Sequence, residues 1–526
     1  MTHPDGPERI AIVGGGVAGL SALWLLNEHS PHNVEIYEAE GRLGGHANSI
    51  LFQRELQPGK QGAWVDTAFV MFNSIGWPNF FRFLRGADVP VQRSSGSYSV
   101  SHPLFAWGSR SPWTLFTGPL GIFDWRPWRM VLEVMRWNYR ALDVIRQPRG
   151  VTCDGRPCVD ESVGVWLRRN GFSDIFRDSY LIPLAATIWS IPPKHIIENI
   201  SIRTIAEGFH STDMLKLFHR SPWYIVQGGS REYIKRIAGR VDPDCIHLGA
   251  PIQAVREGHD AVELVLSDGS VRAYDHVILA THSDTAYRLL QQGQSLRQGD
   301  EEILTTCSWE DLEVVMHYDE TVMPRNRKVW SAWNSFVGGE SKGGLSSTSV
   351  ATFDMNLLHG LPVDTHGRMF GSINPPKSPD PDKVVCTVRY TSPILVGGPQ
   401  NVAGRLKNDP SAHTRRIRFA GAWTGLGTHE DGWVSGITVA EELGAVMPWA
   451  KVDRSPRVPE RNYVELLCVT LLEMTIGRFW GRLLSHASWG GEPLYQPMRR
   501  GVCFVWPLCF LVLFSRIVCG RAGECA

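Results

Sequence analysis

Three glycines and one carboxylate near the N-terminus have the types and spacing of a nucleotide-binding turn. Gly14, Gly16 and Gly19 follow the apolar run at residues 10–13, and Glu38 ends the next strand-like run. In such a turn the first glycine makes the tight bend, the second lets the backbone approach a pyrophosphate, and the third allows close packing of helix and strand. A carboxylate at this distance accepts hydrogen bonds from a ribose hydroxyl group. The spacing therefore predicts a dinucleotide cradle.

The cradle requires a strand, a helix and a second strand around the glycines. Residues 10–13 are predicted to form the first strand, residues 17–29 the helix and residues 33–37 the second strand. Val17 and Ala18 begin the helix, where free backbone N–H groups face a bound phosphate. A purely structural turn with no ligand is the alternative reading.

The continuation of the sequence distinguishes between the possible dinucleotides. Glu38, Arg42, Gly44 and Gly45 form a Glu-x-x-x-Arg-x-Gly-Gly pattern, followed by His46. This pattern resembles that of the flavin amine oxidase and phytoene desaturase superfamily. The resemblance implies that the acid holds the adenosine ribose of FAD, and that the arginine and glycines pass beside the pyrophosphate and ribityl chain. No second Gly-x-Gly-x-x-Gly occurs later, so a separate NAD(P)H site is not supported.

Later segments carry the same resemblance. The run at 417–425 is similar to the superfamily's late strand and turn at the flavin phosphates, and the run from 429 opens a helix whose N-terminus would face the flavin. Ala422 and Ala68 depart from the usual acid and glycine at their positions. By resemblance, the further residues that bind the non-covalent FAD are His46, Ile252, Gly421, Asp431, Gly432, Trp433 and Val434.

The resemblance covers about residues 8–448 and is nearest to a branch of NAD/FAD-binding oxidoreductases associated with lipid-modifying enzymes. It implies an α/β fold, in which a Rossmann-like FAD-binding domain of the glutathione reductase and amine oxidase type is interleaved with an α+β substrate domain. We expect the FAD-binding domain in residues 1–75, 225–288 and 412–448. The substrate domain with its helical cap would take residues 76–224 and 289–411, and residues 449–526 would form a C-terminal tail.

The chemistry implied is hydride transfer from a substrate to flavin. The strand-like run at 312–318, which is similar to the substrate strand of amine oxidases, contains no lysine, and Trp433 has no clear aromatic partner. We therefore expect dehydrogenation of a lipophilic fatty-acyl, polyketide or isoprenoid chain. His429 and Glu430 are the candidate catalytic residues that would take the accompanying proton, unless they only brace the flavin helix.

Other functions remain open at this stage. The chain could be an FAD-dependent amine oxidase, a flavin-dependent polyene isomerase without net redox change, or a non-catalytic membrane-bound flavoprotein. The sequence does not indicate an oligomeric state.

The amino-acid composition restricts the classes of partner that the chain is expected to bind. The 526 residues include 53 Lys and Arg and 53 Asp and Glu, so the net charge is zero and nucleic-acid binding is not expected. No Cys-x-x-Cys pair is present, and no metal site is expected. The N-terminus lacks the pattern of a cleaved signal, which predicts an intracellular protein. Apolar runs within residues 464–519 predict possible membrane association of the tail.

Overall fold

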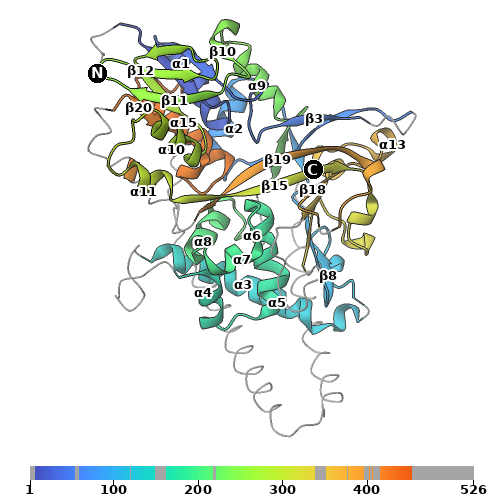
Figure 1. Cartoon of the computed structure of the whole chain (residues 1–526). Helices are drawn as coiled ribbons and strands as arrows, with labels where there is room; N and C mark the ends of the chain where they lie inside the picture. The colour runs from blue at the N-terminus through green and yellow to red at the C-terminus, as the bar shows by residue number, and fades with distance from the viewer. Residues whose placement is uncertain are drawn as a thin grey trace.

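The computed structural model of the chain is shown in Figure 1. It describes residues 6–53, 59–118, 120–147, 161–216, 221–337, 351–375, 377–395, 402, 405–406 and 415–452. The apolar runs within residues 464–519, for which membrane association was predicted, lie outside these described residues. The linker after residue 452 and the first five residues lie outside them too. Within the described part of the chain, no helix combines the length and apolar character needed to cross a membrane.

A parallel five-stranded sheet forms the centre of the first domain (Figure 1). Its order is β10 (Ile246–His247), β2 (Asn33–Tyr37), β1 (Arg9–Val13), β14 (His276–Leu279) and β20 (Ile417–Phe419). Alternate residues of a strand point to opposite faces. Ile10 and Ile12 accordingly pack against α1 (Val17–His29) and α15 (His429–Glu442), whereas Ala11 and Val13 belong to the core on the other face. Both faces of the sheet are thus covered.

The second face is covered by an antiparallel sheet and a helix. The sheet contains β11 (Ile252–Glu257), β12 (Val262–Leu266) and β13 (Val271–Tyr274), and α10 (Ser283–Gln292) packs against β11. The hairpin between β12 and β13 turns at Gly269, whose φ of +82° lies in the left-handed region that glycine tolerates. Three smaller helices complete this domain: α2 (Pro78–Gly86), α9 (Arg231–Ala238) and α11 (Asp300–Leu304).

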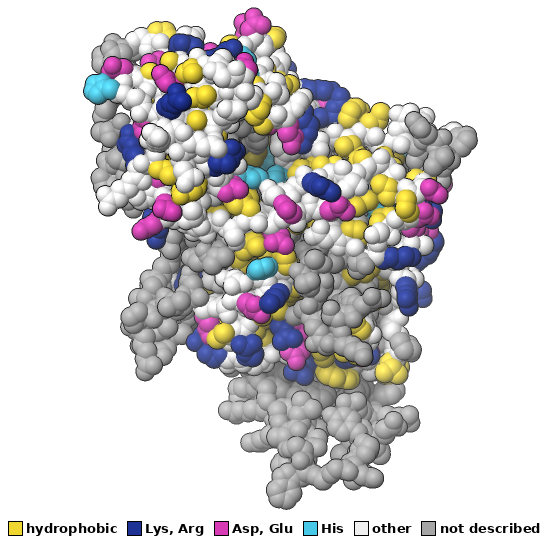
Figure 2. All heavy atoms as spheres, in the orientation of Figure 1, with side chains coloured by type: hydrophobic (Ala, Val, Ile, Leu, Met, Phe, Trp, Pro, Cys, Tyr) yellow, Lys and Arg dark blue, Asp and Glu magenta, His cyan; other side chains and the backbone are white. Residues whose placement is uncertain are grey.

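A mixed seven-stranded sheet forms the second domain. Its order is β19 (Val384–Leu395), β15 (Cys307–His317), β18 (Phe370–Ile373), β17 (Ala351–Asp354), β16 (Trp333–Phe336), β7 (Tyr98–His102) and β8 (Phe105–Gly108). Near it lie the helices α12 (Met355–His359) and α13 (Val363–His366), the pair β3 (Ser49–Phe52) and β4 (Ala63–Asp66), and a small sheet of β5 (Phe72–Asn73), β9 (Trp223–Val226) and β6 (Val91–Ser94). On the face in Figure 2, hydrophobic side chains gather over the region of β15 and β19.

A cluster of helices lies at the far end of the seven-stranded sheet, in the lower part of Figure 1. It contains α3 (Trp125–Arg146), α4 (Val163–Arg169), α5 (Asp174–Phe176), α6 (Ile182–Trp189), α7 (Pro193–Glu198) and α8 (Ile202–Ser211). Asp124 caps α3 by accepting the Arg126 backbone N–H at 3.0 Å. The apolar side of α3 buries Met130, Val134 and Trp137 in a core shared with α6 and α8. The helical cap is therefore held to the substrate domain by one continuous core.

The fold class is confirmed, and so are the first strand–helix–strand unit and the helix that starts at His429. The structure differs from the expected domain limits at two places. Helix α2 buries Phe80 and Phe83 in the core of the parallel-sheet domain, beyond the expected limit at residue 75. Helices α10 and α11 bury Leu289 and Leu304 there too, beyond the limit at residue 288. These three helices complete apolar surfaces that the parallel sheet cannot cover alone.

Candidate active site

One large cavity joins the two domains. Its volume is about 1810 Å³, more than the roughly 300–1,000 Å³ of an ordinary ligand pocket. Its walls include the glycine turn after β1, the ends of β2 and β14, the cap helices α3 and α6, and the strands β15 and β19. The cavity thus has room for a cofactor at the parallel sheet and for a substrate between the domains.

The three glycines of the first turn have three different geometric roles. Gly14 has a φ of +108°, and a Cβ atom there would lie 2.6 Å from the Ala280 carbonyl oxygen. A Cβ atom on Gly19 would lie 1.9 Å from the Gly14 oxygen, so this glycine allows the helix to approach the turn. A Cβ atom on Gly16 would meet no protein atom within 4 Å, and Gly16 lines the cavity with Val17 and Ala18. The turn therefore presents bare backbone to the cavity.

Glu38 lies on the cavity wall at the end of β2, as expected. Its Oε2 atom accepts the Gly15 backbone N–H at 2.6 Å, and its Oε1 atom accepts the Glu40 N–H at 2.8 Å. Ile252 lines the neighbouring wall at the start of β11. These positions place a hydrogen-bond acceptor and an apolar wall at the end of the cavity where an adenosine would lie.

The loop after Glu38 is placed as expected, except for its arginine. Gly44, Gly45 and His46 line the cavity. The Arg42 guanidinium does not line it; Nη1 and Nη2 each donate to the Gly45 carbonyl oxygen at 3.1 Å. In this structure Arg42 therefore holds the loop in shape, because its donors are directed to a backbone carbonyl group.

The start of helix α15 is placed differently from the expectation. Gly421 lines the cavity, but Asp431, Gly432, Trp433 and Val434 do not. Asp431 completes a capping box, in which its Oδ2 atom accepts the Thr428 N–H at 2.9 Å and the Thr428 hydroxyl group at 2.6 Å.

Gly432 and Trp433 serve the packing of α15 against the rest of its domain. A Cβ atom on Gly432 would lie 2.6 Å from a methyl carbon of Val17. Trp433 is fully buried and packs on Trp24 and Phe83, with ring centroids 5.9 and 4.5 Å apart. The side chain of Trp433, named above as an FAD-binding residue by resemblance, therefore belongs to the core of the domain and does not line the cavity, because helical periodicity turns it inward.

Glu430 is also directed away from the cavity. Its side chain is fully buried, and its Oε1 and Oε2 atoms accept the backbone N–H groups of Asn79 and Phe80 at 2.8 and 3.0 Å. The carboxylate therefore satisfies the free N–H groups at the start of α2. The hypothesis that Glu430 takes a substrate proton conflicts with this placement.

His429 lines the cavity. Its ring stacks on Phe69 with centroids 3.7 Å apart, and its Nε2 atom shares a hydrogen bond of 3.1 Å with the Tyr233 hydroxyl group. Its Nδ1 atom is buried and has no partner in the described protein. Burial, and then the nearby His46, lower the pKa of His429 to about 3. The imidazole is therefore neutral at physiological pH, with one ring nitrogen unsatisfied.

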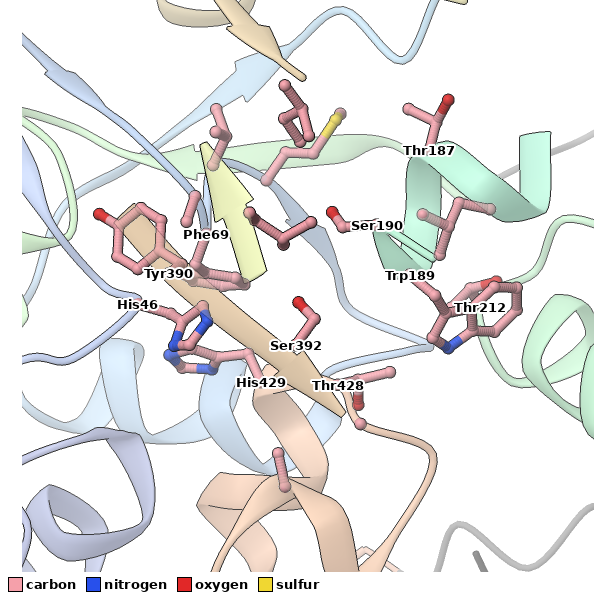
Figure 3. Close-up of a pocket in the computed structure, with 18 of the residues that line it drawn as sticks. His46, Phe69, Thr187, Trp189, Ser190, Thr212, Tyr390, Ser392, Thr428 and His429 are labelled. Carbon is pink, nitrogen blue, oxygen red and sulfur yellow. The ribbon is translucent and has the colours of Figure 1, made fainter. Parts of the chain in front are cut away.

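His46 and Tyr390 lie beside His429, as Figure 3 shows. The rings of His46 and Tyr390 stack with centroids 4.9 Å apart. Burial, and then the charge of His282, lower the pKa of His46 to about 4. The Tyr390 hydroxyl group is held by Asn48 and Thr67 at 2.9 and 2.5 Å. This end of the cavity is therefore walled by neutral rings fixed in position.

The residues present fit FAD. The open backbone at Gly16, the carboxylate of Glu38 and the unsatisfied Nδ1 atom of His429 all lie on the wall of one cavity. A buried polar atom without a partner is costly in a folded protein, and a bound ligand can satisfy it.

Comparisons with known proteins agree with this geometry. A sequence model for an NAD(P)-binding Rossmann-like domain matches residues 12–87, and one for flavin-containing amine oxidoreductases matches residues 155–347. The chain belongs to the flavin amine oxidase superfamily. The matches support an FAD-dependent oxidoreductase, with FAD as the cofactor of this chain.

Individual relatives show how far the similarity extends. The chain is 46% identical over 50 residues to a polyenoic fatty acid isomerase of Ptilota filicina. Such matches span about a tenth of the length of the curated relatives. The chain also shares its fold with cyclohexylamine oxidase from Brevibacterium oxydans IH-35A (TM-score 0.58, 16% identity) and a fatty acid isomerase from P. acnes (TM-score 0.57, 13% identity). Each alignment covers 83% of this chain and 99% of the other.

Several residues that line the cavity of this flavin amine oxidase homologue were not among the site residues predicted from the sequence. Tyr390, Ser392, Trp189 and Ser190 line the cavity, but they come from segments without a glycine motif. The one available signal is the alternation in the strand-like run that contains Tyr390 and Ser392, which places both side chains on the same face of β19.

Proposed function

We propose that FAD accepts a hydride from one carbon atom of a lipophilic chain in this protein while the neighbouring carbon atom releases a proton, so that the chain gains a double bond and the flavin is reduced. The observation that carries the proposal is the apolar chamber that continues from the cofactor cradle. Its walls include the apolar side chains Leu115, Phe116, Val131, Val134, Leu184, Ile188, Leu312, Val314, Phe353 and Ile373. A long apolar chain would bury its surface against these residues, and such burial is the main source of binding energy for a lipophilic ligand.

The charged groups of the cavity support a lipophilic substrate over an amine. Among the described residues that line it, no lysine is present. The carboxylates of Glu38 and Glu40 lie at the adenosine end of the cradle. Asp213 accepts the Ser221 backbone N–H at 2.9 Å and pairs with Lys216 at 2.8 Å, so its charge is already compensated. A cationic amine in the chamber would therefore lack a dedicated carboxylate partner.

The residues of the chain have three tasks in this reaction. Gly14, Gly16, Glu38 and Gly45 would hold the FAD, which when bound supplies the hydride acceptor. The stacked rings of His46 and Tyr390 give a rigid wall that orients the chain and excludes water. His429, which is neutral, can hold a hydrogen bond at Nδ1 without placing a charge beside the reacting carbon atom.

A polyene isomerase is a second candidate, because two of the similar proteins are named as fatty acid isomerases. Amine oxidation is the third candidate reaction, because cyclohexylamine oxidase is similar to this chain. The three reactions differ in what they leave behind: reduced flavin and an alkene, a shifted double bond, or reduced flavin and an imine.

The test is anaerobic mixing of the FAD-loaded full chain with fatty-acyl, polyketide and isoprenoid chains and with simple amines. We expect one lipophilic class to bleach the flavin absorbance and to yield a product with one additional double bond. Bleaching by amines alone would contradict the proposal, and a shifted double bond without bleaching would replace desaturation by isomerisation.

Two neighbouring residues of α3 provide matched variants for this test. Val131 lines the cavity, whereas the adjacent Leu132 does not. Val131→Trp should therefore slow bleaching by filling the chamber, and Leu132→Trp should leave the rate close to that of the wild type. Equal rates in the two variants would show that the chamber does not hold the substrate.

A further inference from the structure

Ser190 has an unusual backbone conformation at the end of α6. Its φ and ψ of 54° and 33° lie in the left-handed region, and it follows the last helical residue, Trp189. Glycine or asparagine is the usual residue at such a position, because other side chains are strained there. A serine here gives up stability, and residues with this kind of strain concentrate at functional sites.

The Ser190 side chain is directed into the cavity. Figure 3 shows its hydroxyl oxygen pointing toward the space bounded by Phe69, Tyr390 and Ser392. In the part of the chain that the structure describes, no residue hydrogen-bonds to the side-chain oxygen of Ser190 or of Ser392. The other labelled hydroxyl groups differ, since Thr187, Thr212 and Thr428 each bond to protein atoms.

Trp189 fixes the position of Ser190 relative to the cofactor cradle. Its indole N–H group donates to the Leu426 carbonyl oxygen at 3.0 Å, and its ring stacks on Phe209 with an interplanar angle of 7°. Leu426 belongs to the loop that leads into His429 at the start of α15. The end of α6 and the residue that faces the flavin region are therefore tied to the same loop.

Ser392 approaches the same space from the opposite side. It lies on β19 two residues after Tyr390, so the two side chains share a face of the strand. Ser392 is 8% exposed, and that exposure is to the cavity. Figure 3 shows its hydroxyl group between the His46 and His429 rings and the end of α6. Two hydroxyl groups without a protein partner thus point into the same part of the cavity, beside the apolar side chains of its wall.

We infer that Ser190 and Ser392 form a hydrogen-bonding pair for one oxygen atom carried by the substrate chain close to its reacting carbon atom. This inference rests on the lipophilic substrate class proposed above and narrows it to chains with a hydroxyl or carbonyl group along their length. An oxygen atom in an apolar chamber must be hydrogen-bonded to enter without a large desolvation cost. A plain hydrocarbon segment would leave both serine hydroxyl groups without a partner.

Oleate and ricinoleate form a suitable pair of probes, because ricinoleate is oleate with one additional hydroxyl group along the chain. Their affinities for the oxidised FAD-loaded full chain can be measured by the change in flavin absorbance on titration. We expect ricinoleate to bind about tenfold more tightly, since each neutral hydrogen bond strengthens binding by roughly two- to tenfold. Ser190→Ala and Ser392→Ala should each reduce this preference while leaving the affinity for oleate nearly unchanged.

Ser190→Gly tests whether the serine is present for binding or for structure. Glycine should raise the melting temperature because it tolerates the left-handed conformation, and it should reduce the preference for ricinoleate over oleate as Ser190→Ala does. The matched control is Gln294→Gly, because Gln294 also has a positive φ of 55° but does not line the cavity. That variant should gain stability and keep the full preference for ricinoleate.

Three outcomes would overturn the inference. Equal affinities of the wild type for oleate and ricinoleate would contradict the proposed recognition of a substrate oxygen atom. They would not contradict the proposed lipophilic substrate class. A loss of FAD affinity in Ser392→Ala, with an unchanged preference for ricinoleate, would assign that hydroxyl group to the cofactor cradle. Failure of the wild type to bind either probe would count against the fatty-acyl form of the proposed function and against this inference together.

Discussion

Glu430 of α15 bonds to Asn79 of α2 twice: its Oε1 atom accepts the Asn79 backbone N–H at 2.8 Å and the Asn79 side-chain amide at 2.9 Å. The two residues are 351 positions apart in the sequence. The bond connects the helix that begins at the cavity wall with a helix in the core of the same domain. A carboxylate beside a candidate base thus acts as a structural cap.

Replacing Glu430 should therefore affect stability more than turnover. In Glu430→Ala the buried N–H groups of Asn79 and Phe80 lose their acceptor, and each such loss costs roughly 1–3 kcal/mol. We expect the free energy of unfolding to fall by about 3 kcal/mol in urea titrations. Glu442→Ala is the matched control on the same helix, because the Glu442 side chain is 52% exposed and makes a long ion pair of 3.7 Å with Arg418, so its removal should lower the free energy of unfolding by less than about 1 kcal/mol. A stable Glu430→Ala variant without activity would restore the catalytic hypothesis.

Close packing of α1 and α15 should depend on Gly436. A Cβ atom there would lie 2.0 Å from the Ala18 carbonyl oxygen and 2.2 Å from the Ser21 Oγ atom. Gly436→Ala should push the helices apart, lower stability by about 1–3 kcal/mol and weaken FAD retention, since Ala18 lines the cradle. Thermal unfolding and the flavin content after gel filtration measure both effects. Gly41→Ala, where a Cβ atom would meet no atom within 4 Å, should change neither.

Replacement of Trp433 should leave the reaction with the flavin intact. Trp433→Phe keeps an aromatic ring in the core beside Trp24 but removes volume, so we expect a lower melting temperature. The visible flavin spectrum and the rate of flavin bleaching should stay close to those of the wild type. A variant that folds as stably as the wild type but bleaches many times more slowly would show that Trp433 contacts the reaction after all.

The stability of the protein should fall as the pH falls from about 6.5 to about 4. His317 is fully buried, and burial lowers its pKa from 6.5 to about 4. Its Nδ1 atom accepts the Asp319 N–H at 3.1 Å, so protonation there would break this bond. The unfolded chain therefore binds the proton more tightly than the folded protein, and His317 contributes a slope of up to about 1.4 kcal/mol per pH unit in this range.

Two variants test this contribution. In His317→Gln the free energy of unfolding, measured by urea titration at several pH values, should depend less steeply on pH between about 4 and 6.5. His259→Gln is the control, because the His259 side chain is 97% exposed, and its slope should match that of the wild type. If the free energy of unfolding depended on pH equally steeply in the wild type and both variants, the pH dependence could not be attributed to His317.

The nucleotide cradle could be predicted because its features are local. Gly14, Gly16 and Glu38 lie within one strand–turn–helix–strand unit, and backbone geometry alone relates their positions. The substrate chamber could not be predicted in the same way. Its walls at Ser190, Tyr390 and Ser392 come from segments that are distant in the sequence, and no local motif requires these residues to meet.

The elements that surround the glycine turn could be predicted from the sequence, because glycine conformation, helix periodicity and motif spacing act over short distances. The family and the cofactor were indicated by the resemblance of the glycine motifs to those of a known superfamily. The direction of each side chain at the start of α15 became clear only from the packing of the folded protein. His429 faces the cavity, whereas Glu430 and Trp433, one and four residues later, are turned into the core. A helix rotates about 100° with each residue, so which side chain faces the cavity depends on what packs around the helix.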